Sequence, residues 1–268
     1  MTTPEHPQAR ERQEPDRERS DCDDSRPYAA VHAAPDGETD LPELVATASE
    51  YGFGGVVVRN HGDARAEYDA DALSERFGVD VVDGVEVRAE DPSRAGGYVG
   101  SHRESATLVA VHGGTNALNR FAVEQPAVDV LAHPMAGDGD FNHVLAKTAA
   151  RNGVRVELSL RPVLRSVGGE RVRTLQDLRK LWDLLSEYDT PYVVSADAPS
   201  RLRLRAPREL AALGDLVGLD TGAVEAGLAE WGALARRNRY RHSDAFVEPG
   251  VRVVEPGDAD DGSGPEVE

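Results

Sequence analysis

The chain has 268 residues, of which 40% are hydrophobic, and its formal net charge is −18 at pH 7. This length and apolar content suit one large α/β domain, whereas a single cysteine, Cys22, excludes a disulfide framework and a cysteine-based zinc site. There is no run of 18 apolar residues and no apolar signal segment at the N-terminus, so the sequence predicts a soluble, cytoplasmic protein without a membrane partner.

The acidity comes with an unusual choice of basic residue. Lys147 and Lys180 are the only lysines, so arginine carries nearly all the positive charge. Excess Asp and Glu, few lysines and small core residues are typical of proteins from salt-loving archaea, where self-repulsion is screened over a few ångströms. We therefore attribute the acidity to the solvent. It does not exclude RNA binding, which would depend on local arginine contacts.

Two charged stretches flank the part of the chain that can form a core. Residues 1–26 contain almost no large apolar side chains, and residues 246–268 are acidic and rich in Gly and Pro. Such segments bury too little surface to offset the entropy of ordering. The sequence predicts one folded domain, 27–245, between disordered tails at 1–26 and 246–268.

Strand-like and helix-like segments alternate through this domain. The predicted helices include one that Asp140 caps, a long one that begins at Thr174 and a last one around Trp231, and glycine pairs such as Gly96–Gly97 are predicted to be turns. The predicted strands cover residues 28–32, 56–58, 79–87, 108–112, 128–132, 154–160 and 191–195.

Short connections between about seven strands indicate a parallel sheet. The segment 154–160 decides its form, because its apolar residues face one way while Arg155, Glu157 and Ser159 face the other. An open sheet is covered by helices on both faces, whereas a barrel admits polar side chains at its mouth. The sequence therefore predicts an α/β fold, a TIM-like (β/α) barrel whose strand number need not be eight.

Imidazoles and carboxylates recur where the predicted strands end. Such side chains around a barrel mouth suit a metal-dependent phosphoesterase, in which they hold divalent ions that acidify a bound water. The remaining histidines, among them His61 and His102, form no plausible ligand set and are predicted to lie on the surface or at helix caps. The strand-end residues are His32, Glu86, His112, His133, Glu157 and Asp197.

The segments GVEV, LAHP and SADA, which contain Glu86, His133 and Asp197, resemble the polymerase-and-histidinol-phosphatase (PHP) barrel superfamily. That resemblance implies a metal centre, but two positions depart from its pattern. Ala30 replaces the first histidine of the opening motif, and Pro199 replaces the histidine of the last one. We therefore expect no metal. The cluster His32, Glu86, His133 and Asp197 is expected to be a vestigial, hydrogen-bonded network.

A second resemblance covers more of the chain. The segments VHGGTNALNRFAVEQPAVDVLAHP, HVLAKTAARNGVRVELSLRPVL and DAPSRLRLRAPREL are similar to the archaeal ribonuclease P protein component 3 family, with a degenerate PHP-like barrel. The resemblance implies a protein subunit of the ribonucleoprotein that removes the 5′ leader from precursor tRNA. The RNA subunit then carries the chemistry with Mg²⁺, and this chain has neither a cofactor nor a catalytic residue of its own. The implied partners are the ribonuclease P RNA, component 2, the other protein subunits and precursor tRNA.

Arginines follow two of the predicted strands. If the strands are neighbours, both loops project from one edge of the barrel and form a basic patch for RNA. One guanidinium group can donate two parallel hydrogen bonds to the oxygens of a phosphate. Each arginine alone could equally pair with a surface carboxylate. Lys147, in HVLAK, is a further candidate. The predicted RNA-binding residues are Arg161, Arg165, Arg201, Arg203, Arg205 and Lys147.

Two alternatives stay open at this point. The first is a free-standing PHP-type phosphoesterase that uses His32, Glu86, His133 and Asp197. The second is a protein-binding scaffold whose arginines can be replaced without effect.

Overall fold

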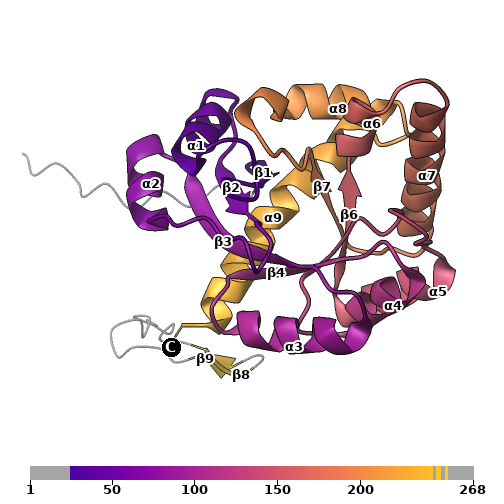
Figure 1. Ribbon diagram of the computed structural model, residues 1–268, viewed down its shortest axis with the longest axis horizontal. Coiled ribbons are helices and arrows are strands. Elements are labelled where there is room, and N and C mark those ends of the chain that lie inside the picture. The colour runs from indigo at the N-terminus through magenta and orange to yellow at the C-terminus, as the bar shows by residue number, and fades with distance from the viewer. Residues whose placement is uncertain (1–24, 244–245, 249–250, 253–268) are drawn as a thin grey trace, which may run out of the picture.

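Seven parallel strands form the centre of the fold, and they are ordered in the sheet as they are in the chain (Figure 1). The computed structural model describes residues 25–243, 246–248 and 251–252. The strands are β1 (Tyr28–Val31), β2 (Gly55–Val58), β3 (Asp80–Val87), β4 (Leu108–His112), β5 (Val130–Ala132), β6 (Arg155–Ser159) and β7 (Tyr192–Ser195).

The sheet closes on itself between its first and last strands. A parallel bridge joins Val31 to Ala198, the residue that lies three positions after β7. The backbone nitrogen of His32 donates to the Ala198 carbonyl at 3.1 Å, and the Ala198 nitrogen donates to the Ala30 carbonyl at 3.4 Å. The predicted (β/α) barrel is therefore confirmed, with seven strands where a standard TIM barrel has eight.

Helices form the outer layer of the barrel. Outward-facing strand residues such as Val56, Val58, Val156 and Leu158 are buried beneath them in one continuous core. The helices are α1 (Leu41–Glu50), α2 (Ala70–Phe77), α3 (Pro92–Arg103), α4 (Asn116–Glu124), α5 (His143–Asn152), α6 (Arg161–Arg165), α7 (Gly168–Glu187), α8 (Pro207–Asp215) and α9 (Thr221–Arg241), with a short 3₁₀ turn, η1, at Arg201–Arg203.

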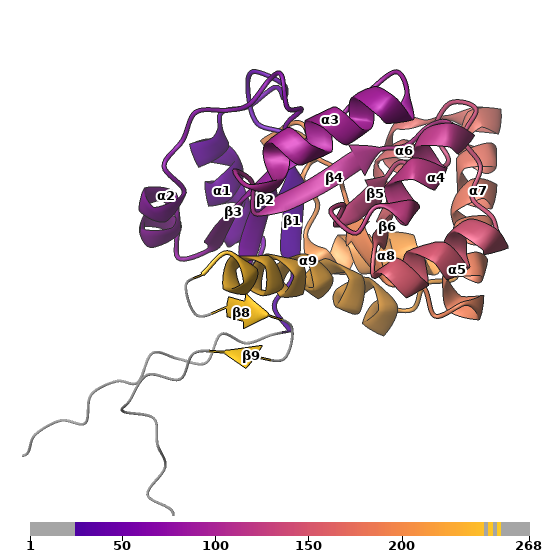
Figure 2. The same cartoon turned by 90° about the horizontal axis from the view of Figure 1, so that it is seen from below.

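The last helix, α9, packs against the inner face of the strands. Figure 2 shows it crossing below β1, β2 and β3. Its Trp231 belongs to a second core cluster with the inward-facing Ala30, Val57 and Val193. A Cβ at Gly232 would lie 2.4 Å from the ring of Tyr28, so glycine permits this close approach. Apolar packing on α9 therefore fills one end of the barrel and leaves the other end for polar side chains.

Two helix boundaries and one whole helix differ from the sequence prediction. Asn142 rather than Asp140 caps α5, because its side chain accepts from the first free backbone nitrogens of that helix. The long helix α7 begins at Gly168 rather than Thr174. Gly96–Gly97 lies inside α3 instead of a turn, in a helix that begins with an Asp91 cap.

A short antiparallel pair follows α9. Its strands are β8 (Phe246–Glu248) and β9 (Val251–Arg252), and both fall within the stretch 246–268 that was predicted to be disordered. The rest of that stretch and residues 1–24 lie outside the described residues. No helix in the described ranges is long and apolar enough to cross a bilayer.

Candidate functional site

Charged side chains form a layer at the carboxyl ends of the strands, inside the mouth of the barrel. His32 and Arg59 come directly after β1 and β2, Glu86 and Glu157 lie within β3 and β6, and Asp197 follows β7. None of the five is more than 4% exposed. They continue the inward-facing rows whose earlier members pack on α9, so strand alternation places them all in one small space.

Arg59 lies at the centre of this layer. Its Nε and Nη2 donate to Glu86 Oε2 at 3.1 and 2.7 Å. Its Nη1 donates to Glu157 Oε1, and its Nη2 donates to Glu157 Oε2 at 3.2 Å. The same Nη2 lies 3.3 Å from His133 Nε2 and 3.7 Å from Asp197 Oδ1. One guanidinium group thus joins residues from four strand ends.

The charges in the layer stabilise one another. Burial by itself would lower the pKa of Arg59, but Glu157, Glu86 and Asp197 hold it well above its ordinary value. Burial would likewise raise the pKa of Glu86 and of Asp197, but Arg59 and hydrogen bonds from histidines hold both well below their ordinary values. Arg59, Glu86 and Asp197 are therefore charged at neutral pH, and the charge of each depends on the others.

Two members of the site have a backbone conformation that side chains seldom adopt. His133, after β5, has a φ of 50°, and Asp197, after β7, has a φ of 44°. Their side chains meet, with Nε2 of His133 3.4 Å from Oδ2 of Asp197. Such strain persists only where surrounding contacts enforce it. The contacts of the charged layer supply that constraint.

The residues of the mouth do not fit the multi-metal centre of the PHP superfamily. The guanidinium of Arg59 occupies the space among the carboxylates that would have to coordinate ions, and it would repel a divalent cation there. Two smaller ligand groups remain, one of them Glu86, His112 and His133. Glu86 is already bonded to Arg59 and to His112 Nδ1, the latter at 2.5 Å. His32, Glu86, His133 and Asp197 thus form a network that is centred on Arg59.

The second ligand group consists of His32, Asp36 and His61. Asp36 accepts from His61 Nδ1 at 2.5 Å and lies 3.1 Å from His32 Nδ1, while His32 Nε2 lies 2.8 Å from Asp197. His61 is 5% exposed, so the prediction that it lies on the surface or at a cap was wrong. Burial and the neighbouring Arg88 lower its pKa.

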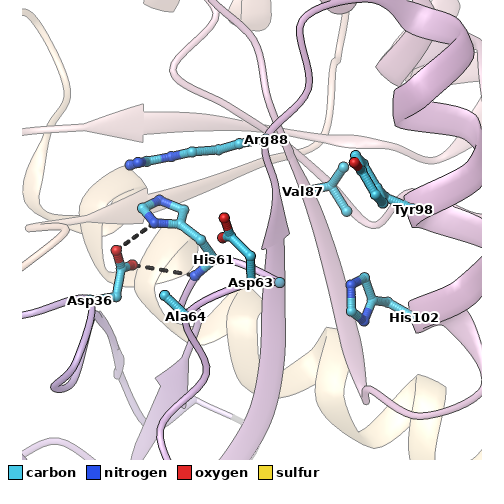
Figure 3. Close-up of a pocket in the computed structure, with 9 residues that line it drawn as sticks. Asp36, His61, Asp63, Ala64, Val87, Arg88, Tyr98 and His102 are labelled. Carbon is cyan, nitrogen blue, oxygen red and sulfur yellow. Dashed lines mark hydrogen bonds and ion pairs between the residues drawn. The ribbon is translucent and has the colours of Figure 1, made fainter.

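A pocket of about 390 Å³ opens beside Asp36 and His61 (Figure 3). Figure 3 shows His61 joined to Asp36 on one side and Arg88 lying over the imidazole ring. Tyr98 and His102, both on α3, form the opposite wall, so His102 also has a place in a pocket that the sequence did not suggest. His61 Nε2 is buried without a hydrogen-bond partner among the described residues.

The two arginine loops do project from one edge of the barrel, as predicted, since β6 and β7 are neighbours. Figure 1 shows α6 at the end of β6. Arg161, on α6, donates to the buried Asp197 at 3.0 Å. Arg165 is exposed and has no hydrogen-bond or ion-pair partner in the described part of the chain.

The arginines of the second loop have different partners. Arg201 lies 3.2 Å from Glu43, and Arg203 lies 3.1 Å from Glu38. Within the described part of the chain, Arg205 donates only to backbone carbonyl oxygens, at 3.1 and 2.8 Å. Pairing with a surface carboxylate, the alternative considered for each single arginine, therefore holds for Arg201 and Arg203. We name the set Arg161, Arg165, Arg201, Arg203 and Arg205 the arginine rim.

Lys147 is not part of the arginine rim. Its Nζ lies 4.9 Å from the centre of the Tyr188 ring, directly after the C-terminal end of α7. The rim residue Arg165 precedes the N-terminal end of the same helix. A helix of 20 residues is about 30 Å long, so the two side chains lie at opposite ends of α7.

Sequence reasoning missed Arg59 and Asp36. Arg59 follows the four-residue apolar strand β2 in the way that His32 and Asp197 follow theirs. Its position at a strand end is therefore the sequence signal that marks it, as it marks the imidazoles and carboxylates of the site. Asp36 lies in a loop, and no periodic signal marks it.

Comparisons with known proteins agree on the family. The model of the RNase P subunit p30 family matches residues 28–243. "Ribonuclease P protein component 3" of Haloarcula marismortui is 56% identical over 234 residues, which are 87% of this chain and 99% of the relative. The protein of the same name from Natronomonas pharaonis is 54% identical and covers 87% and 98%. Both are halophilic archaea, as the composition predicted for the source of this chain.

Solved structures add the fold and the assembly of a relative. A chain in the cryo-EM structure of archaeal ribonuclease P with mature tRNA superposes with a TM-score of 0.73 at 26% identity, covering 86% of this chain and 99% of that one. Histidinol phosphate phosphatase from Lactococcus lactis, with zinc, L-histidinol and phosphate, superposes at 0.51 with 11% identity and covers 72% and 92%. The second likeness shows the shared barrel fold alone. The family model and the two archaeal relatives show that this chain belongs to the ribonuclease P subunit p30 family, that of archaeal protein component 3.

Proposed function

We propose that this chain acts as a protein subunit of ribonuclease P, the ribonucleoprotein endoribonuclease that removes the 5′ leader from precursor tRNA. The proposal is supported by family membership over residues 28–243 and by the likeness to a chain of archaeal ribonuclease P. In this role the RNA subunit carries the chemistry with Mg²⁺, and the chain stabilises that RNA without a cofactor of its own. The barrel domain, 27–245, works in the cytoplasm.

The observation that carries the proposal is the contrast between the arginine rim and the barrel mouth, where Arg59 fills the space among the carboxylates. Five arginines gather at one edge of a protein whose net charge is −18. Guanidinium groups bind phosphate oxygens in pairs and keep their charge at any physiological pH. The rim therefore binds the ribonuclease P RNA. Lys147, at the other end of α7, makes a separate contact with it.

The partners follow from the same role. Component 2 and the other protein subunits are its partners in the assembled particle, and precursor tRNA is the substrate of that particle. The free-standing phosphoesterase is the weaker candidate, because Arg59 fills the space that its metal ions need.

Reconstitution tests the proposal. Pre-tRNA cleavage is measured with the RNA and partner proteins, with and without the full chain, over a range of salt concentrations. Replacing Arg165 and Arg205 with Ala removes two phosphate contacts and should weaken RNA binding about tenfold or more. Replacing Arg171 and Arg173, exposed on α7, removes equal charge and should have little effect. Unchanged cleavage with the rim variant at every salt concentration would contradict the proposal.

A further inference from the structure

Four residues of the arginine rim line one small cavity. It has a volume of about 50 Å³ and lies between α6 and the loop that follows β7. Arg161 and Arg165 reach it from α6, and Arg203 and Arg205 reach it from the loop. An ordered water needs only about 10–15 Å³. The cavity therefore has room for a compact anion.

Contacts within the protein hold three of the four guanidinium groups in place. Arg161 is fixed by Asp197 at 3.0 Å, and Arg203 is fixed by Glu38 at 3.1 Å. Arg205 is fixed by two backbone carbonyl oxygens. Side chains that are already ordered lose little conformational entropy when a ligand binds. The cavity is thus arranged in advance for its ligand.

Positive charge exceeds negative charge around the cavity. Arg165 has no acidic partner in the described residues, and Arg205 contacts only neutral carbonyl oxygens. Asp197, which accepts from Arg161, also balances Arg59. Guanidinium groups this close repel one another, and an anion in the cavity would remove the repulsion.

We propose that this cavity binds a single backbone phosphate of RNA; the proposal rests on the proposed function and names the chemical group that the arginine rim recognises. The apolar residues of the cavity wall are Leu164, Ala196 and Pro199, and none of the lining residues offers an aromatic ring on which a base could stack. A phosphate contact is independent of base sequence. Because the cavity is partly enclosed, salt screens this contact less than it would screen one on an open surface.

Ethylation interference with the full chain tests the cavity directly. Ribonuclease P RNA is ethylated at about one phosphate per molecule, and the bound fraction is mapped. With the wild-type protein, ethylation at one phosphate should block binding. In Arg165→Ala that position should become silent while other positions stay sensitive, and affinity should fall about tenfold. Arg165 has no partner in the described residues, so the variant should fold, as its unfolding temperature will show.

Two further variants make the test specific. Arg165→Lys keeps the charge but loses the planar fork, so its affinity should lie between wild type and Arg165→Ala. Arg173→Ala removes an exposed arginine that does not line the cavity, and it should keep the whole wild-type pattern. If Arg165→Ala keeps that pattern too, or loses a protein partner while its RNA pattern is unchanged, the cavity holds no RNA phosphate and the proposal is overturned.

A second measurement separates failure of this proposal from failure of the proposed function. Inorganic phosphate replaces chloride at equal ionic strength, and thermal unfolding of the protein alone is followed. Phosphate should raise the unfolding temperature of the wild type more than that of Arg165→Ala. Equal shifts would overturn the cavity even if the protein binds ribonuclease P RNA. Absence of RNA binding together with a larger wild-type shift would instead overturn the proposed function and support an anion site.

Discussion

Arg59 and Arg165 lie at the same end of the barrel, but their surroundings differ. Arg59 is 1% exposed and donates hydrogen bonds to two buried carboxylates, whereas Arg165 is exposed and has no partner in the described part of the chain. The inner arginine satisfies charges that the fold has buried. The outer one is available to charges from outside. Burial, rather than residue type, decides which role an arginine has.

The comparison also bears on the fold that this chain shares with a zinc-containing phosphatase. Carboxylates at the mouth need a cation, because an unpaired buried carboxylate is costly. The structure of histidinol phosphate phosphatase contains zinc. In this chain the guanidinium of Arg59 lies among the carboxylates. The shared fold is therefore compatible with two sources of positive charge.

The largest effect is expected from Arg59→Met. Removing the cation leaves Glu86, Glu157 and Asp197 buried without it, and breaking such a buried pair costs about 3–5 kcal/mol. Denaturant unfolding should show this loss in the free energy of unfolding. The matched control is Arg173→Met, an exposed residue on α7, which should change that free energy by no more than about 0.5 kcal/mol. A loss below about 1 kcal/mol for Arg59→Met would show that Arg59 does not hold the layer together.

The same variant should reverse the response of stability to pH. In the wild type the folded-state pKa values of Glu86 and Asp197 are lowered by Arg59, so their stabilisation is present above the unfolded pKa and is lost as pH falls through the folded one. In Arg59→Met burial prevails and raises these pKa values. The variant should then gain stability as the pH falls from about 8 to about 5, whereas the wild type should not. Parallel pH curves for the two proteins would contradict this account.

Arg161 belongs to the arginine rim and also bonds to Asp197 of the charged layer, so its replacement should have an intermediate effect. Arg161→Ala removes one hydrogen bond to Asp197. The Asp197 carboxylate still has His32 and Arg59 beside it. Because the Arg161 side chain is 38% exposed, we expect a loss of about 1 kcal/mol in the free energy of unfolding. RNA affinity should fall as well. A change in stability without a change in RNA affinity would show that Arg161 supports the charged layer and does not bind RNA.

The smallest effect is expected at the outer edge of the rim. Arg201 and Glu43 form an exposed pair at 3.2 Å, and such pairs contribute little in water and less in salt. Arg201→Ala should change the free energy of unfolding by no more than about 0.5 kcal/mol. Its ethylation-interference pattern should match the wild type at the phosphate assigned to the cavity, which Arg201 does not line.

Much of the fold could be predicted because the strands obey simple rules of alternation. In β6 the apolar residues face the helices, and Glu157 therefore had to face the barrel interior. Helix α3 was missed for an equally physical reason, since Gly96, Gly97 and Gly100 lower its intrinsic propensity. The buried Ala95 and Val99 and the Asp91 cap stabilise it instead.

The site was less predictable, because its contacts join distant parts of the chain. The strand ends gave the positions of His32, Glu86 and Asp197, but not that an arginine lies among them. The bond from Arg161 to Asp197 spans 36 residues and depends on how α6 packs near the end of β7. No spacing in the sequence distinguishes an arginine that turns inward from one that faces RNA.

Reconstituted pre-tRNA cleavage is the most direct test of the central claim, with the doubly substituted Arg165→Ala, Arg205→Ala chain compared with His133→Ala under identical Mg²⁺ and salt. Both proteins should first be shown to be folded at the assay temperature. The account predicts that the rim variant slows cleavage about tenfold or more at limiting protein, while His133→Ala, which changes a strand-end histidine outside the rim, cleaves at nearly the wild-type rate. The reverse result, with activity dependent on His133 and indifferent to the rim, would contradict it.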